Sequence, residues 1–246
     1  MLRISETVLA GIPCFEIVEP GTTPQAEIIL YHGWGSHAKK QCFRGRLLAS
    51  FGYRVIVPEI AGHGVRGSLD YEAATSVVDF LQVLAQSIRE CGLLAKEVLT
   101  AGRSHFLVGH SLGGMIVLGA AAGLQAQLNG VVAMNSSANW ADTLAMMQGV
   151  YGNDPQLQAL LASEAAVRTM TELEHCDPVL WQAQGMTLPV LLTNGALDQT
   201  LPASLNEAFC AANGGEHVRQ VVFPDAGHVV TDGMLAEVVT FIENHQ

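Results

Sequence analysis

Positive charge is scarce in this sequence, and long hydrophobic runs are missing. Only 12 Lys and Arg residues stand against 23 Asp and Glu residues, which gives a formal net charge of −11 at pH 7. Nucleic acids and anionic membranes are bound by clustered cations, so neither is an expected partner. Residues 1–11 hold no apolar segment typical of a signal peptide, and no later segment has the length of a membrane span. Neutral or cationic small molecules are the expected substrates.

Cysteine is also sparse, and its spacing argues against two common uses. The sequence has five cysteines, and no two of them form a Cys-x-x-Cys pair. An odd number of widely spaced cysteines argues against a disulfide framework, and metal sites usually show close pairs of ligands. We expect no bound metal, a cytoplasmic location, and reduced, buried thiols at Cys14, Cys42, Cys91, Cys176 and Cys210.

What the sequence does contain is a large apolar fraction in a regular order. Of its 246 residues 49% are hydrophobic and 14% are charged, as expected for one domain, residues 1–246, whose sheet is buried on both faces. Apolar runs alternate with amphipathic ones, which is typical of a parallel sheet with crossover helices. Strands are expected at Glu27–Tyr31, Tyr53–Pro58, His105–Gly109, Gly130–Met134, Leu188–Thr193 and His217–Phe223. Helices are expected at Ala38–Phe51, Tyr71–Cys91, Leu112–Leu124, Ala203–Ala212 and Val229–Asn244.

Two segments interrupt this alternation of predicted strands and helices. The turn-rich segment Glu19–Gln25 should link two early strands. The segment Ser136–Thr187 is rich in Ala, Met and Leu at helical spacing, and we interpret residues 136–187 as an inserted helical cap. Cap side chains such as Met146 and Trp181 could bind substrate, although apolar residues at this spacing more often pack one helix on another.

A nucleophile candidate lies where a predicted strand meets a predicted helix. Gly109-His110-Ser111-Leu112-Gly113 matches the Gly-x-Ser-x-Gly pattern, with an apolar strand before it and a small-residue helix after it. A serine on a strained turn crowds the residues two positions away, and glycine relieves that crowding on both sides. The following helix directs N–H groups and its dipole toward a developing oxyanion, so the amide of Leu112 is a predicted donor.

In this setting the sequence resembles the α/β-hydrolase superfamily from about Glu27 to the C-terminus. The resemblance implies an α/β fold with a mostly parallel central sheet of about eight strands and helices on both faces. It also implies that the helical cap is inserted after the sixth strand. The segment Tyr31–Pro58 is similar to small bacterial serine esterases, including prolyl-oligopeptidase-type and dienelactone-hydrolase-like members.

The resemblance extends to the loop after an early central strand. In that superfamily a His-Gly pair stands there, and the amide of the next residue completes the oxyanion hole. Here the motif is His32-Gly33-Trp34-Gly35, so the resemblance assigns this amide, and a substrate contact, to Trp34. The alternative is an ordinary tight turn. The loop Pro58–Gly64 carries Glu59 where the superfamily usually has Asp, a departure expected to affect loop geometry and not catalysis.

A serine hydroxyl needs a base and an acid that orients the base. Histidine suits the role of base because its ordinary pKa is close to 7. His228 follows the last predicted strand, where the superfamily places its histidine, whereas His110 is expected only to pack. Of three candidate acids, Asp198, Asp225 and Asp142, the resemblance favours Asp198, which follows the strand at Leu188–Thr193 and obeys the order serine, acid, histidine.

These residues predict acyl transfer from a small-molecule carboxylic ester through an acyl-enzyme, with no cofactor. The same triad geometry also serves peptidases, thioesterases, lactonases and cofactor-free haloperoxidases. An alternative of another class is a ligand-binding receptor that keeps the fold without catalysis. The expected assembly is a monomer or a homodimer.

Overall fold

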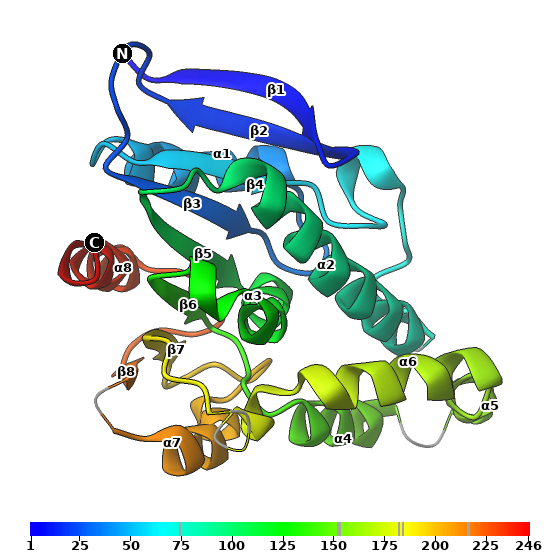
Figure 1. Cartoon of the computed structure of the whole chain (residues 1–246). Coiled ribbons are helices and arrows are strands. Elements are labelled where there is room, and N and C mark those ends of the chain that lie inside the picture. The colour runs from blue at the N-terminus through cyan, green and yellow to red at the C-terminus, as the bar shows by residue number, and fades with distance from the viewer. Residues whose placement is uncertain (74, 152–153, 182, 184, 216) are drawn as a thin grey trace.

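A mostly parallel β-sheet forms the centre of the computed structural model, which describes every residue except 74, 152–153, 182, 184 and 216. Among the described residues its strands are β1 (Arg3–Leu9), β2 (Ile12–Val18), β3 (Ala26–Tyr31), β4 (Arg54–Pro58), β5 (Ser104–His110), β6 (Gly130–Met134), β7 (Val190–Gly195) and β8 (Val218–Phe223). They lie in the order β1-β2-β4-β3-β5-β6-β7-β8 (Figure 1). β1 pairs antiparallel with β2 and β2 with β4, and the remaining pairs are parallel. The predicted fold class is confirmed.

Each strand predicted from an apolar run is present, with small differences at the ends. Glu19–Gln25 links β2 to β3, as predicted. No bounds were predicted for β1 and β2, which form a hairpin. The outer strand Arg3–Leu9 has no buried residue and therefore carries no apolar run that would reveal it.

Helices cover both faces of the sheet because successive side chains of a strand point to opposite sides. The covering helices are α1 (Ala38–Ala49), α2 (Ser76–Val98), α3 (Leu112–Leu124), α7 (Glu207–Asn213) and α8 (Asp232–Asn244). In β3, Ile28 and Leu30 belong to the core shared with α1 and α8. The alternate residues Ile29 and Tyr31 belong to the core shared with α2 and α3.

The long helix α2 differs from its prediction at both ends. The prediction covers Tyr71–Cys91 with a stop at Gly92, whereas the helix is Ser76–Val98 and runs through that glycine. Glycine inside a helix costs about 1 kcal/mol relative to alanine. Leu94 and Val98 continue the buried stripe, and burying one such side chain stabilises by about 2 kcal/mol. Packing beyond the glycine therefore outweighs its local preference.

A helical insertion lies between β6 and β7, as predicted. Its elements are α4 (Trp140–Tyr151), α5 (Pro155–Leu161), α6 (Glu164–Cys176) and the 3₁₀ turn Pro178–Leu180. Asp154 and Ser163 begin α5 and α6 by accepting hydrogen bonds from first-turn amides. α6 packs against α2 and α3. Figure 1 shows the insertion gathered beside the start of α2, away from the β1–β2 hairpin.

The cysteines are free thiols, and they differ in burial. Cys14, Cys42 and Cys91 are buried, whereas Cys176 and Cys210 are half-buried. Burial raises the pKa of Cys14 and of Cys91 to about 12. In the part of the chain that the structure describes, no cluster of three His, Cys, Asp or Glu side chains is arranged to hold a metal ion. None of the helices described there is both long and apolar enough to cross a membrane.

Candidate active site

Ser111 stands on a strained turn between β5 and α3. Its φ is 55° and its ψ is −121°, a backbone conformation that side chains rarely adopt and that costs roughly 1–3 kcal/mol. A Cβ on Gly109 would overlap the backbone of Gly113, and a Cβ on Gly113 would overlap the carbonyl of His32. The Ser111 amide donates to the carbonyl oxygen of Met134 at 2.9 Å. Both glycines are thus required by close backbone approach, as the sequence pattern predicts.

A continuous line of hydrogen bonds joins the three residues that the sequence proposes as a triad. His228 Nε2 lies 2.9 Å from Ser111 Oγ, and His228 Nδ1 lies 2.7 Å from Asp198 Oδ2. A carboxylate can only accept, so Nδ1 carries the proton and the lone pair of Nε2 faces the serine hydroxyl. Asp198 Oδ1 accepts from the amides of Thr200 and Leu201, each at 2.9 Å. Asp198 is therefore held through both of its carboxylate oxygens.

The parallel sheet brings these distant residues together. Ser111 follows β5, Asp198 follows β7 and His228 follows β8. Parallel strands end at the same edge of a sheet, so the loops that follow them meet there. The side chain of Asp198 is fully buried, whereas that of His228 is 25% exposed. His228 is therefore reachable from solvent, whereas Asp198 is not.

The competing acids lie elsewhere. Asp225 is exposed, and Asp142 accepts from the side chain of Asn139 at 2.7 Å in the first turn of α4. Neither is bonded to His228 among the described residues. At the end of β6, Asn135 accepts from the amide of Gly195 at 2.9 Å. This buried side chain positions the start of the loop that carries Asp198, a role that its sequence context did not reveal.

The loop after β3 runs directly against the serine. A Cβ on Gly33 would lie 3.1 Å from Ser111 Cβ, which places the backbone of this loop beside the hydroxyl. Within the described part of the chain, no acceptor is bonded to the amide of Trp34 or to that of Leu112. Both amides are therefore free to donate, and their role as oxyanion donors stays a prediction.

Three aromatic rings surround the indole of Trp34. Its ring centre lies 5.1 Å from those of His63 and Tyr71 and 5.4 Å from that of Phe80, all in edge-to-face contact. The His63 Nε2 atom accepts from the amide of Gly35 at 3.1 Å. These rings come from segments far from the His-Gly motif, so sequence spacing gave no signal for them. Together they hold the loop that carries the Trp34 amide.

A buried pair supports the same loop from beneath. His32 Nε2 lies 3.0 Å from Glu59 Oε1, which also accepts from the amide of Ala38 at 2.9 Å. Burial acts to raise the pKa of Glu59, but the hydrogen bonds from His32 and Ala38 outweigh it and hold the pKa below its usual value. Glu59 thus links β4, α1 and the His-Gly motif. Its predicted effect on loop geometry has this physical basis.

Glu59→Gln is expected to lower the free energy of unfolding by about 2–3 kcal/mol at neutral pH, because a buried charged partner is lost. The folded-state pKa of Glu59 is lowered, so its stabilisation is complete above the unfolded pKa of about 4.3. It is lost as the pH falls through the folded-state value. Urea unfolding at a series of pH values should show that the difference in free energy of unfolding between native protein and variant becomes smaller as the pH falls from neutral to acidic.

The exposed Glu72 supplies the control for this measurement. Glu72→Gln should change the free energy of unfolding by less than about 0.5 kcal/mol. The difference in free energy of unfolding between native protein and Glu59→Gln could instead stay constant as the pH falls. That result would contradict the assignment of a stabilising charge to Glu59.

His110 packs beside His228, as its sequence position predicts. Its ring centre lies 5.3 Å from that of His228. Burial, and then the positive charge of a protonated His228, lower the pKa of His110 to about 3. The ring is therefore neutral at pH 7 and does not compete for the proton of the serine.

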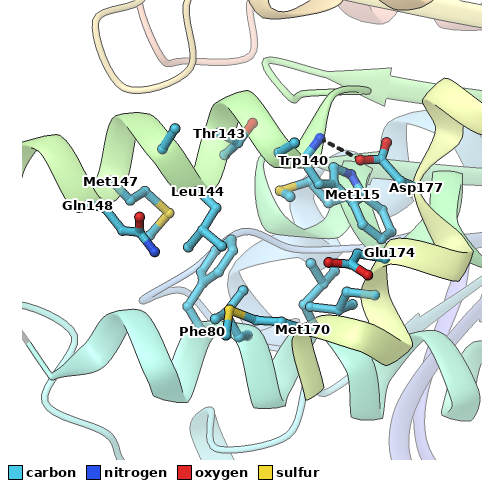
Figure 2. A pocket seen from close by; sticks show the side chains of 15 residues that line it. Phe80, Met115, Trp140, Thr143, Leu144, Met147, Gln148, Met170, Glu174 and Asp177 are labelled. Carbon is cyan, nitrogen blue, oxygen red and sulfur yellow. Dashed lines mark hydrogen bonds between the residues drawn. The ribbon is translucent and has the colours of Figure 1, made fainter. Parts of the chain in front are cut away.

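The three substrate-binding candidates occupy different surroundings. Trp34 directly follows Gly33, whose backbone lies against Ser111. Trp181 is buried and packs edge-to-face on Phe209 of α7, with ring centres 5.5 Å apart. Met146 is half-buried on α4. An apolar cavity below α4 (Figure 2) is lined by the neighbouring Met147, and not by Met146 or Trp181.

The sheet order, the helical insertion and the serine on its strained turn define an α/β hydrolase. The model of the alpha/beta hydrolase family matches residues 28–241, which is most of the chain. The chain therefore belongs to that family. Both the predicted resemblance and the predicted fold are confirmed by this match.

Individual relatives are similar over the whole chain. Esterase YjfP of Escherichia coli (strain K12) is 28% identical, and the match covers 100% of both chains. Monoacylglycerol lipase of Mycolicibacterium smegmatis is 23% identical, with 98% of each chain covered. The crystal structure of TT1662 from Thermus thermophilus superposes with a TM-score of 0.74 at 21% identity and covers 99% of this chain and 98% of its own. That structure shows the fold alone.

Proposed function

We propose that this α/β hydrolase is a carboxylesterase that forms an acyl-enzyme on Ser111. The observation that carries the proposal is the unbroken line of hydrogen bonds from Ser111 Oγ through His228 to the buried Asp198. Each link has the direction that proton transfer requires, because the accepting nitrogen faces the hydroxyl. The esterase and lipase names of relatives similar over the whole chain support an ester as the bond that is cleaved.

The first half of the reaction forms the acyl-enzyme. His228 Nε2 takes the proton as Ser111 Oγ bonds to the ester carbonyl carbon, and the carbonyl oxygen becomes an oxyanion. The amides of Trp34 and Leu112 donate to this oxygen, which stabilises charge that exists only in the transition state and the intermediate. The carbon–oxygen bond to the alcohol then breaks, and His228 returns the proton to the leaving alcohol.

Water completes the cycle by the same route. His228 takes a proton from water as the water oxygen bonds to the acyl carbon, and the bond to Ser111 Oγ breaks with return of that proton. Asp198 keeps the imidazole in one tautomer and stabilises its charged form in both halves. The helical segment 136–187 is proposed to act as the cap that bounds the substrate site. Every step uses protein groups and water, so the proposed cycle needs no cofactor.

An alkyl fluorophosphonate tests this proposal without knowledge of the natural substrate. The probe should phosphonylate Ser111 at one equivalent per chain, with loss of fluoride, because only an activated serine reacts with it. Peptide mass spectrometry should place the added mass on residues that include Ser111, and Ser111→Ala should remain unlabelled. An unlabelled native protein would instead favour a receptor that keeps the fold without catalysis, and labelling at another serine would refute the assignment.

A further inference from the structure

An apolar cavity of about 260 Å³ lies between the inserted helices and the helices of the sheet face. Hydrophobic side chains of α2, α3, α4 and α6 form most of its wall: Phe80, Leu84, Met115, Leu144, Met147 and Met170. The side chains of α4 converge with those of α2 and α6 on this space in Figure 2. Thr143, Gln148, Glu174 and Asp177 add a minority of polar groups. Such a wall fits an apolar group and offers little to a charged one.

Two residues connect this cavity to the proposed site. Met115 lies one helical turn after Ser111, and its amide donates to the carbonyl of Ser111 at 3.2 Å. Phe80 contacts the ring of Trp34, whose amide is the proposed oxyanion donor. Residues of the cavity wall therefore neighbour both the serine turn and the loop after β3. An apolar end of a substrate held at Ser111 would enter this space from that side.

The proton path decides which end of an ester this is. His228 must protonate the leaving alcohol, so the alcohol portion lies on the side of His228. The acyl portion extends from the carbonyl carbon on another side of the serine. Among the described residues, the cavity wall includes none from the loops that carry Asp198 and His228. This placement, away from the path of the leaving alcohol, favours the acyl side of the carbonyl for the cavity.

Its volume sets the approximate size of the acyl group that it can hold. An engineered apolar cavity of about 150 Å³ takes up benzene in another protein. In proportion, 260 Å³ has room for roughly ten carbon atoms. Two carboxyl side chains at the wall, Glu174 and Asp177, disfavour an acyl group that carries a negative charge.

We infer that this cavity binds the acyl chain of the substrate, and that the substrate class is esters of uncharged, medium-chain fatty acids of about eight to ten carbons. The inference rests on the proposed function, because it names the substrate of the same Ser111 site. It also assigns a specificity role to Met147 of α4.

The test compares p-nitrophenyl acetate, butyrate, octanoate and decanoate as substrates of the native protein and of Met147→Trp. For the native protein, kcat/KM should rise by roughly fourfold for each methylene added, up to octanoate or decanoate. The larger indole fills the cavity, so Met147→Trp should lower the octanoate-to-acetate ratio of kcat/KM by at least about tenfold. Acetate is too short to reach the cavity, so the octanoate-to-acetate ratio, and not the rate with either ester alone, is the readout.

Val150 supplies the matched control because it lies on the same helix, is 72% exposed and does not line the cavity. Val150→Trp should leave the octanoate-to-acetate ratio unchanged. If Met147→Trp fails to fold, as judged by thermal unfolding, Leu144→Phe fills the same cavity with a smaller change.

The outcomes separate this inference from the proposed function. The protein could turn over acetate while neither cavity variant lowers the octanoate-to-acetate ratio of kcat/KM. This result would overturn the assignment of the cavity to the acyl chain, but the proposed esterase activity would stand. A native protein that prefers acetate to octanoate would do the same. No turnover of any ester, together with no labelling of Ser111 by the fluorophosphonate, would refute the proposed function and the substrate class with it.

Discussion

Ser111→Ala is expected to lower kcat for p-nitrophenyl acetate by roughly 10⁴-fold to 10⁶-fold, the range seen when a triad nucleophile is removed. The physical reason is that Ser111 Oγ, 2.9 Å from His228 Nε2, is the atom that bonds to the acyl carbon in the proposed cycle. Alanine retains the Cβ and removes only the hydroxyl. The remaining rate would come from water attack assisted by the free amides of the oxyanion hole.

The measurement is release of nitrophenolate by native protein and variant under the same conditions. Thermal unfolding should show that Ser111→Ala remains folded, since the hydroxyl contributes no other hydrogen bond among the described residues. Ser50→Ala is the control, because Ser50 is exposed at the end of α1. The activity of this variant should equal that of the native protein. A folded Ser111→Ala variant that keeps more than about a tenth of native kcat would refute the assignment of Ser111 as the nucleophile.

Asp198→Asn is expected to lower kcat by roughly 10³-fold to 10⁴-fold with a much smaller change in KM. The amide is almost the same size as the carboxylate, and its oxygen can still accept from the amides of Thr200 and Leu201. Its NH₂ group, however, would face His228 Nδ1 and favour the tautomer that carries the proton on Nε2. The base would then present a proton, and not a lone pair, to Ser111.

Two other aspartates serve as matched controls for this charge loss. Asp225 precedes His228 closely in the chain but is exposed, and Asp142 is bonded to Asn139. Asp225→Asn and Asp142→Asn should each change kcat by less than about threefold, because surface charges act weakly on the base. If Asp225→Asn caused the larger loss, the acid would have to be reassigned to Asp225.

The loop that carries Trp34 links activity to stability. Glu59 supports the loop from beneath through His32, while the rings of His63 and Tyr71 enclose the indole. None of these side chains contacts the reacting atoms, so they act as positioning residues for the Trp34 amide. A loss of support would displace the proposed oxyanion donor, and such donors require placement within a fraction of an ångström.

Local pattern accounts for the parts of this protein that the sequence predicted. Buried strands require apolar runs, so the strands of the sheet centre and the insertion after Met134 could be located from composition. The turn at Ser111 demands glycine on both sides, which makes Gly109 and Gly113 visible in the sequence. His228 and Asp198 were placed by their order after successive strands, together with the resemblance.

Tertiary structure decided what depends on contacts between distant segments. The apolar stripe continues through Gly92, so packing against the sheet extends α2 to Val98. The partners of Glu59 and Trp34 come from other loops, and nothing in local spacing identifies them. The choice between Met146 and Met147 at the cavity wall depends on the rotation of α4, which is set by all the residues that it packs against. Local periodicity specifies which residues are buried, but only the packed chain specifies what each one touches.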